Sequence, residues 1–256
     1  MKPFEFTSYR HDGIVIKSSV RTSDEEYMVV AYKFLNKLMR EFARLSKLAF
    51  QPQIGADNLS YMFSERRLDS VVLPALSTIC KGLVLTELPV ERKVSKDEVK
   101  SPHGRADYWC IFQDYTFVIE MKGSHDRYDC ATIRENSIFK RWGTMVEQLR
   151  DISEQCRQMT ENTKGVIRLG LHFISSWSPV APEADDIKQY RRDAKKYANA
   201  FCLEIAKRHK KADYIPSFTA IWIIPDEMVN YWTDATYPGV LLIAKVFKPI
   251  PLKNNA

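Results

Sequence analysis

Two acids and a lysine fall on a pair of apolar segments in the stretch GRADYWCIFQDYTFVIEMKGS, residues 104–124. The pattern predicts two strands joined by a tight turn, with Asp107 on the first strand and Glu120 and Lys122 on the second. Because side chains alternate between the two faces of a strand, Glu120 and Lys122 share one face with Val118, and Met121 points to the other. Charged groups are costly to bury unless they are paired or bind a metal ion. These residues are therefore candidates for metal-dependent chemistry.

The acid-x-Lys spacing says little by itself, because it occurs five times in the chain. The other copies lie in a polar loop, in a charged helical pattern, or in a strand that no acid-bearing strand precedes. Only Glu120 ends an apolar run that follows a strand carrying an acid. Its position along the chain therefore selects the Glu120-Met121-Lys122 copy.

A definite order of elements surrounds this pair of strands. A helical pattern in SERRLDSVVLPALSTICKGL is followed by the strand patterns VLTELPVERKV, GRADYWCIF and YTFVIEMKG, by a second helical pattern in FKRWGTMVEQLRDISEQCRQM, and by the strand pattern VIRLGLHFIS. With Asp on the middle strand and Glu-x-Lys on the next, this α-β-β-β-α-β order resembles the PD-(D/E)xK nuclease superfamily, which has the restriction-endonuclease-like fold. The resemblance covers residues 60–177. Ala106 stands where the family has a proline before the Asp.

The resemblance implies a nuclease that hydrolyses phosphodiester bonds with Mg²⁺, for which Mn²⁺ substitutes. Mg²⁺ prefers hard oxygen ligands, and the carboxylates of Asp107 and Glu120 supply them. The family further implies the main-chain carbonyl of Met121 as a ligand, and Lys122 as the group that orients or helps to deprotonate the attacking water. The alternative for the same residues is a buried ion pair without catalysis.

An additional acid is expected beside these residues, and two positions compete for the role. Glu65 begins the first helix, where family members often carry a further acidic group, although the helix dipole alone favours an acid there. Glu87 lies on the strand next to the Asp107 strand. We favour Glu65 over Glu87. Gln148, on the helix after the active strands, is a weaker candidate for substrate contact.

The segment GSHDRYDCATIRENS directly follows Lys122 and is expected to form a polar loop at the mouth of the site. Loops on a rigid scaffold often carry binding residues, so Arg127 is a candidate for nucleic-acid contact. His125 in the same segment is more simply explained as a solvated side chain than as a general base.

A second basic region lies in residues 185–211, which hold nine Lys and Arg residues against four acids. A helix with this composition can neutralise phosphates and release their counterions. The candidates for backbone contact are Arg191, Arg192, Lys195 and Lys196. The competing interpretation is a solvated outer face, which is common for runs of charge.

The whole chain of 256 residues is expected to form a single α/β domain with a mixed central sheet flanked by helices. Residues 60–177 form its nuclease-like core. An N-terminal helical preface covers 1–59, in which residues 24–49 have helical periodicity and Asp24 or Ser23 caps the helix. A C-terminal extension, 178–256, holds the basic helix and two strands, FTAIWIIP and GVLLIAKVFKPI.

Composition favours an intracellular protein, and it permits a polyanionic partner without requiring one. The net charge is +6, there is no apolar run of about 18 residues, and the five cysteines lack the spacing of a disulfide framework or zinc site. We therefore expect a cytoplasmic protein without a membrane span or signal peptide. The expected partner is nucleic acid, DNA more than RNA, and the chain acts alone, as a homodimer or as a subunit of a larger system. An RNA-directed nuclease and a non-catalytic nucleic-acid-binding subunit remain alternatives.

Overall fold

The structure is a computed structural model of the chain, and it describes residues 6–12, 14–20, 24–50, 59, 65–80, 82–91, 103–128, 136–152, 163–178, 184–209, 211–229 and 235–251. The strands are β1 (Phe6–His11), β2 (Ile14–Val20), β3 (Leu85–Glu91), β4 (His103–Phe112), β5 (Tyr115–Arg127), β6 (Gly165–Ser178), β7 (Phe218–Ile223), β8 (Thr236–Val246) and β9 (Ile250–Pro251). The helices are α1 (Glu26–Ala49), α2 (Glu65–Cys80), α3 (Asn136–Arg150), α4 (Ala184–Arg208), the short α5 (Asp226–Val229) and a 3₁₀ turn (Ala212–Tyr214).

All described strands belong to one mixed sheet, in the order β1-β2-β7-β8-β6-β5-β4-β3, and β9 pairs with the start of β6. The pair β5–β6 is parallel and the other pairs are antiparallel. A parallel pair needs a long crossover, and α3 lies within the segment that joins β5 to β6. The candidate residues lie on β4 and β5. Neither is an edge strand, because β3 pairs with β4 on its outer side and β6 pairs with β5.

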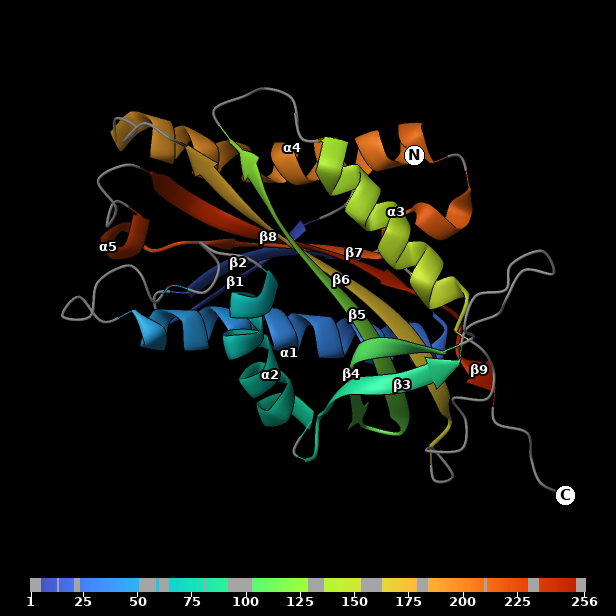
Figure 1. The fold of residues 1–256 in the computed structure, drawn as a ribbon. Helices are drawn as coiled ribbons and strands as arrows, with labels where there is room; N and C mark the ends of the chain where they lie inside the picture. Colours follow the sequence, from blue (N-terminus) through green and yellow to red (C-terminus); the bar gives the residue numbers. More distant parts are fainter. Residues whose placement is uncertain are drawn as a thin grey trace, which may run out of the picture.

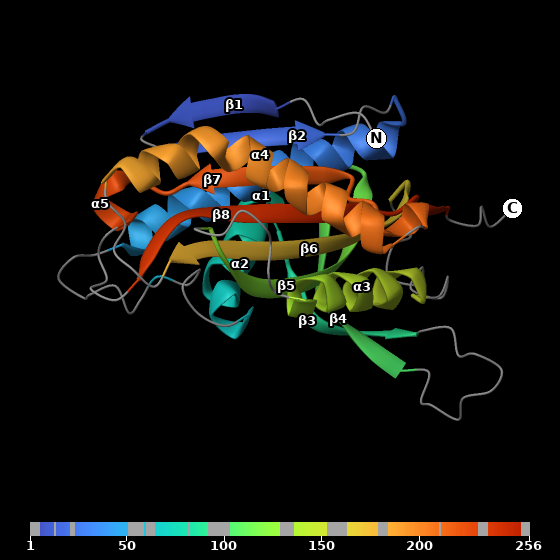
Figure 2. The same cartoon turned by 90° about the horizontal axis from the view of Figure 1, so that it is seen from above.

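Helices cover both faces of the sheet, with α1 and α2 on one side and α3 and α4 on the other (Figures 1 and 2). The α1–α2 side holds one apolar core, which includes Phe117, Ile119 and Met121 of β5. The α3–α4 side holds a second core, to which Val118 belongs. The predicted alternation along β5 is confirmed for these four residues. Because both faces are covered, every residue of β5 from Tyr115 to Met121 is buried, Glu120 included.

The helix α1 confirms the predicted periodicity, since its buried residues include Phe34, Leu38 and Phe42. Phe34 stacks on Phe117 of β5 with ring centroids 4.4 Å apart, which fixes the helix against the central strand. The cap prediction at Asp24 was wrong: the N-cap is Glu25, which makes no side-chain capping bond, while Ser23 lies outside the described residues.

Two features differ from the expectation. Residues 6–11 and 14–20 form the antiparallel strands β1 and β2 rather than helical structure, and β2 continues the main sheet by pairing with β7. The strand β5 runs to Arg127, so the expected loop after Lys122 is strand for its first five residues. The α/β class and the mixed sheet flanked by helices are as expected.

In the described part of the chain, no helix combines the length and apolar character that crossing a membrane requires.

Candidate active site

The strands β4 and β5 separate at Asp107. Their backbone pairing runs from the turn to the pair Tyr108↔Ile119 and ends there. Beyond this pair the Met121 N–H donates to the side-chain Oδ2 of Asp107 over 2.6 Å. The alternation of β4 also breaks here, because Ala106 belongs to the core of the α3 side and Tyr108 to that of the α1 side. The carboxylate therefore lies in the gap between the strands.

Glu87 marks the same irregularity on the other side of β4. It lies between the pairs Thr86↔Tyr108 and Leu88↔Ala106, with a φ of 53°. A positive φ is uncommon for a side chain of this kind and indicates local distortion. Its side chain is 63% exposed and makes an ion pair with Arg105 over 3.5 Å. This geometry directs Glu87 toward Arg105 and solvent.

Burial raises the pKa of Asp107, while the Met121 N–H and the Lys122 charge act in the opposite direction. The net shift is upward, so the protein environment leaves the ionised carboxylate less stable than it is in water. An additional cation beside Asp107 would favour the charged form.

Glu65 is attached to β5 from the first turn of α2. Its Oε2 accepts the Gly123 N–H over 3.0 Å, and its Oε1 lies 3.7 Å from Lys122 Nζ. Gly123 permits this approach, because a Cβ there would lie 2.8 Å from Leu68 Cδ1 and 3.1 Å from Glu65 Cα. The helix therefore begins directly against the strand that carries the Glu-x-Lys residues. Of the two acids that competed for the additional role, Glu65 is the one in contact with Lys122.

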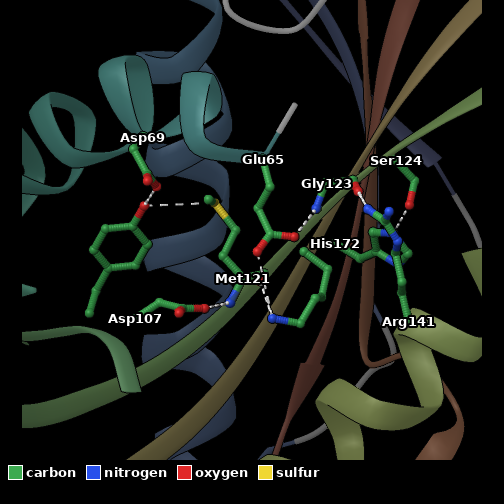
Figure 3. A network of polar contacts seen from close by, with 10 residues as sticks. Glu65, Asp69, Asp107, Met121, Gly123, Ser124, Arg141 and His172 are labelled. Atoms are coloured by element: carbon green, nitrogen blue, oxygen red, sulfur yellow. Dashed lines mark hydrogen bonds and ion pairs between the residues drawn. The ribbon is translucent and has the colours of Figure 1, made fainter. Parts of the chain in front are cut away.

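Lys122 directs its ammonium group back along its own strand. Nζ donates to the Met121 carbonyl oxygen over 2.9 Å, and the side chain is 17% exposed. Figure 3 shows Asp107, Met121 and Glu65 converging on this region. We call the point where β4 and β5 separate, at Asp107 and Met121, the fork. The carboxylates of Asp107 and Glu65, the Met121 carbonyl and the Lys122 ammonium meet there through successive contacts.

Glu120 occupies the position next to this network and is 2% exposed. It pairs with Gly170 of β6, and a Cβ on Gly170 would contact Met145 and Leu149 of α3. Paired residues of parallel strands point to the same face, so Glu120 starts from the α3 side of the sheet. Asp107 and Glu120 are the residues that follow the last β4–β5 pair, one on each strand. The two acids are therefore neighbours along the backbone of adjacent strands, at the point where β4 and β5 separate.

A tyrosine and an aspartate that the sequence did not single out support Asp107 from the α2 side. The Tyr108 hydroxyl donates to Asp69 Oδ1 and lies 3.9 Å from Met121 Sδ. Burial raises the pKa of both groups, and the Asp69 charge further raises that of the phenol. The phenol therefore stays protonated and keeps its donor on Asp69, which ties β4 to α2 beside the fork.

A second polar group that the sequence did not single out lies on the α3 side. Ser124 Oγ is 2.9 Å from Nε2 of the buried His172, and Arg141 of α3 donates to the Gly123 carbonyl. Burial, followed by the Arg141 and Lys122 charges, lowers the pKa of His172 to about 3. The imidazole is therefore neutral at physiological pH. His172 sits in the apolar run VIRLGLHFIS, where sequence alone indicates a core residue.

The remaining candidates lie away from the fork. His125 and Arg127 are on the last part of β5, where Arg127 pairs with Trp177 of β6. Gln148 lies near the C-terminal end of α3. The helix α4 has the expected position in the chain, but its cations differ in setting. Arg191 is 27% exposed and binds Asp226 and the Ile224 carbonyl, whereas Lys196 is exposed and pairs with Asp193 of its own helix.

No protein-family model matches the chain, and neither the curated proteins nor the solved structures include a match. Within the described residues, no group of three or more His, Cys, Asp or Glu side chains is placed to hold a metal ion.

Proposed function

We propose that the protein is a metal-dependent nuclease that hydrolyses phosphodiester bonds, in DNA in preference to RNA, and that its core is restriction-endonuclease-like. The observation that carries this proposal is the fork at Asp107. There the Asp107 carboxylate binds the Met121 N–H while the Lys122 ammonium binds the Met121 carbonyl. The Asp107 carboxylate of β4 and the Lys122 ammonium of β5 thus both contact main-chain atoms of one residue, Met121.

The donor set at the fork suits a hard divalent cation. Asp107, Glu120 and the Met121 carbonyl offer oxygen atoms, and Mg²⁺ usually takes one or two carboxylates and keeps several waters. The upward pKa shift of the half-buried Asp107 supports the fit, because a cation would stabilise its ionised form. Mn²⁺ is expected to substitute. When bound, such an ion supplies Lewis-acid stabilisation of a phosphoryl oxygen and a more acidic water.

Lys122 and Glu65 have separate roles in this proposal. The Lys122 ammonium lies beside the Met121 carbonyl and can orient a water or neutralise charge that develops on the phosphoryl group. Glu65 holds that ammonium from the α2 side and fixes the strand through the Gly123 N–H. Glu65 is therefore proposed as a positioning residue for Lys122.

The wider setting is also a proposal. The described thiols of Cys80, Cys110 and Cys202 are free, which suits a reducing compartment such as the cytoplasm. An RNA-directed nuclease on the same scaffold and a non-catalytic nucleic-acid-binding subunit are the other candidates. The contact between Lys122 and the fork favours a catalytic role over the latter.

Digestion assays test this proposal directly. Purified protein is incubated with supercoiled plasmid, single-stranded DNA or RNA in the presence of Mg²⁺, Mn²⁺ or EDTA. We expect cleavage of DNA with either metal ion and none with EDTA. Cleavage of RNA alone would favour the second candidate, and cleavage that continues unchanged in EDTA would contradict a metal-dependent mechanism.

A further inference from the structure

A pocket of about 300 Å³ lies where the β1–β2 hairpin, the end of β7 and the helix α4 meet. Its polar lining consists of Arg10 from β1, Lys17 from β2, Arg191 from α4 and Asp226 from α5. Apolar side chains such as Val15 and Ile223 form its floor. Three basic residues from three separate elements thus line one depression that also contains a single acid.

Two of these cations are held in place by contacts that leave little freedom. Lys17 Nζ donates to the Arg191 carbonyl over 2.9 Å. Arg191 donates through one terminal nitrogen to the Ile224 carbonyl over 2.8 Å and pairs through the other with Asp226. Its Nε is buried and has no hydrogen-bond partner among the described residues. The side chains of Lys17 and Arg191 are therefore fixed before any ligand binds.

The positive charge of the pocket exceeds what its own acid balances. Burial lowers the pKa of Lys17, and the neighbouring charges of Lys195 and Arg10 lower it further. Asp226 already pairs with Arg191, and its side chain is 82% exposed. An anion in the pocket would relieve the repulsion among the cations, and preorganised donors bind an anion at a lower entropic cost.

We propose that this pocket binds a phosphate group. The pocket offers ammonium and guanidinium donors around a concave surface, which is the chemistry that recognises phosphate. The group could belong to a nucleic-acid backbone or to a small phosphate ligand. Binding of a free phosphate rests on the pocket alone, whereas contact with a nucleic-acid backbone rests on the proposed nuclease function.

The position of the pocket suits the backbone of the same substrate. Across the sheet, Asp126 of β5 pairs with Ser176 of β6, and Ser176 pairs with Gly239 of β8. Gly239 pairs with Ile223 of β7, and Ile223 pairs with Val15 of β2, which lines the pocket. The pocket therefore lies level with the C-terminal end of β5, on the side of the sheet that holds β2 and β7. Four strand spacings separate β5 from β2, about 19 Å, and Asp126 lies about 17 Å beyond Met121 along β5. The fork and the pocket are therefore about 25 Å apart, which corresponds to about seven base pairs of duplex.

The test compares a pocket variant with a matched control. The pocket variant is Arg10→Gln with Lys17→Met, and the control is Arg44→Gln with Lys33→Met on α1, which removes the same charge on the opposite side of the sheet. Arg10→Glu is a second pocket variant, because this exposed side chain can change without affecting the core. Thermal unfolding checks that each variant is folded. Calorimetric titration with inorganic phosphate is the first measurement.

We expect both pocket variants to bind inorganic phosphate at least tenfold more weakly than the wild type and the control. Fluorescence anisotropy with a labelled DNA duplex is the second measurement. A matching loss of duplex affinity identifies the ligand as nucleic-acid backbone. The slope of log affinity against log salt concentration should then be shallower by about two for the double variant. Unchanged duplex affinity with lost phosphate binding identifies a small phosphate ligand.

Equal phosphate affinity in the wild type and both pocket variants would overturn the proposal. The phosphate titration does not depend on cleavage, so it separates this proposal from the nuclease assignment. If the nuclease assignment alone is wrong, phosphate binding still responds to Arg10 and Lys17. If the pocket alone is wrong, the variants cleave and bind as the wild type does.

Discussion

Replacing Lys122 by methionine should lower the rate of DNA cleavage at saturating substrate by about 10²–10⁴-fold, the usual contribution of a positioned acid–base group. Methionine keeps most of the aliphatic length of lysine but removes the ammonium that binds the Met121 carbonyl. The main-chain hydrogen bond from Met121 to Asp107 does not involve the side chain of Lys122, so the fork itself should persist. Single-turnover cleavage of a plasmid measures the effect.

The companion change Asp107→Asn should reduce cleavage to background. The amide oxygen of asparagine can still accept the Met121 N–H, so the fork is retained while the negative charge is lost. Lys164→Met and Asp114→Asn are the controls, because both side chains are about half or more exposed at the turn end of the hairpin. Circular dichroism confirms folding of each variant. Cleavage at the wild-type rate by Lys122→Met would remove that lysine from the mechanism.

Replacing Trp142 by alanine should lower the free energy of unfolding by about 3–5 kcal/mol. The ring is fully buried in α3, and its Nε1–H donates to the Tyr214 carbonyl over 2.8 Å. It also stacks near His172, with ring centroids 6.4 Å apart. The change removes a large apolar group, leaves a buried carbonyl without its donor, and loosens α3 on the strand that pairs with β5. Chemical denaturation measures the loss.

Two further variants separate the contributions of Trp142. Trp142→Phe keeps an aromatic ring and should cost less than the alanine change, with about 1–3 kcal/mol from the unsatisfied Tyr214 carbonyl. Leu203→Ala is the exposed control, because Leu203 is 47% exposed, and should change stability by no more than about 0.5 kcal/mol. Equal losses for the alanine and phenylalanine variants would mean that the hydrogen bond, rather than packing, holds α3.

The hairpin of the candidate site could be predicted because alternation along a strand is a local property of the sequence. Val118 and Met121 lie in opposite cores as that alternation requires. The break at Asp107 could not be predicted in the same way. The break depends on the positive φ of Glu87 in β3 and on the irregular pairing of β4 with both β3 and β5. Neither feature produces a recognisable pattern in the sequence.

Features assembled from distant segments were also beyond the sequence. The strand β2 is placed by its pairing with β7, which lies near the other end of the chain, and β1 is an edge strand with polar residues on much of its length. His172 meets Ser124 because β5 and β6 run parallel, and Arg141 reaches the same point through α3. The basic character of α4 was visible in the sequence, whereas the grouping of its Arg191 with Arg10 and Lys17 required the fold.

Anomalous diffraction from crystals grown with Mn²⁺ tests the proposed metal site most directly. The account predicts one strong peak at the fork, coordinated by a carboxylate oxygen of Asp107, one of Glu120 and the Met121 carbonyl, at distances of about 2.0–2.3 Å. Asp107→Asn crystals treated in the same way should lose that peak. An ion bound elsewhere in a catalytically active crystal form, or Asp107 and Glu120 held on opposite faces of the sheet with no shared ion, would contradict the assignment.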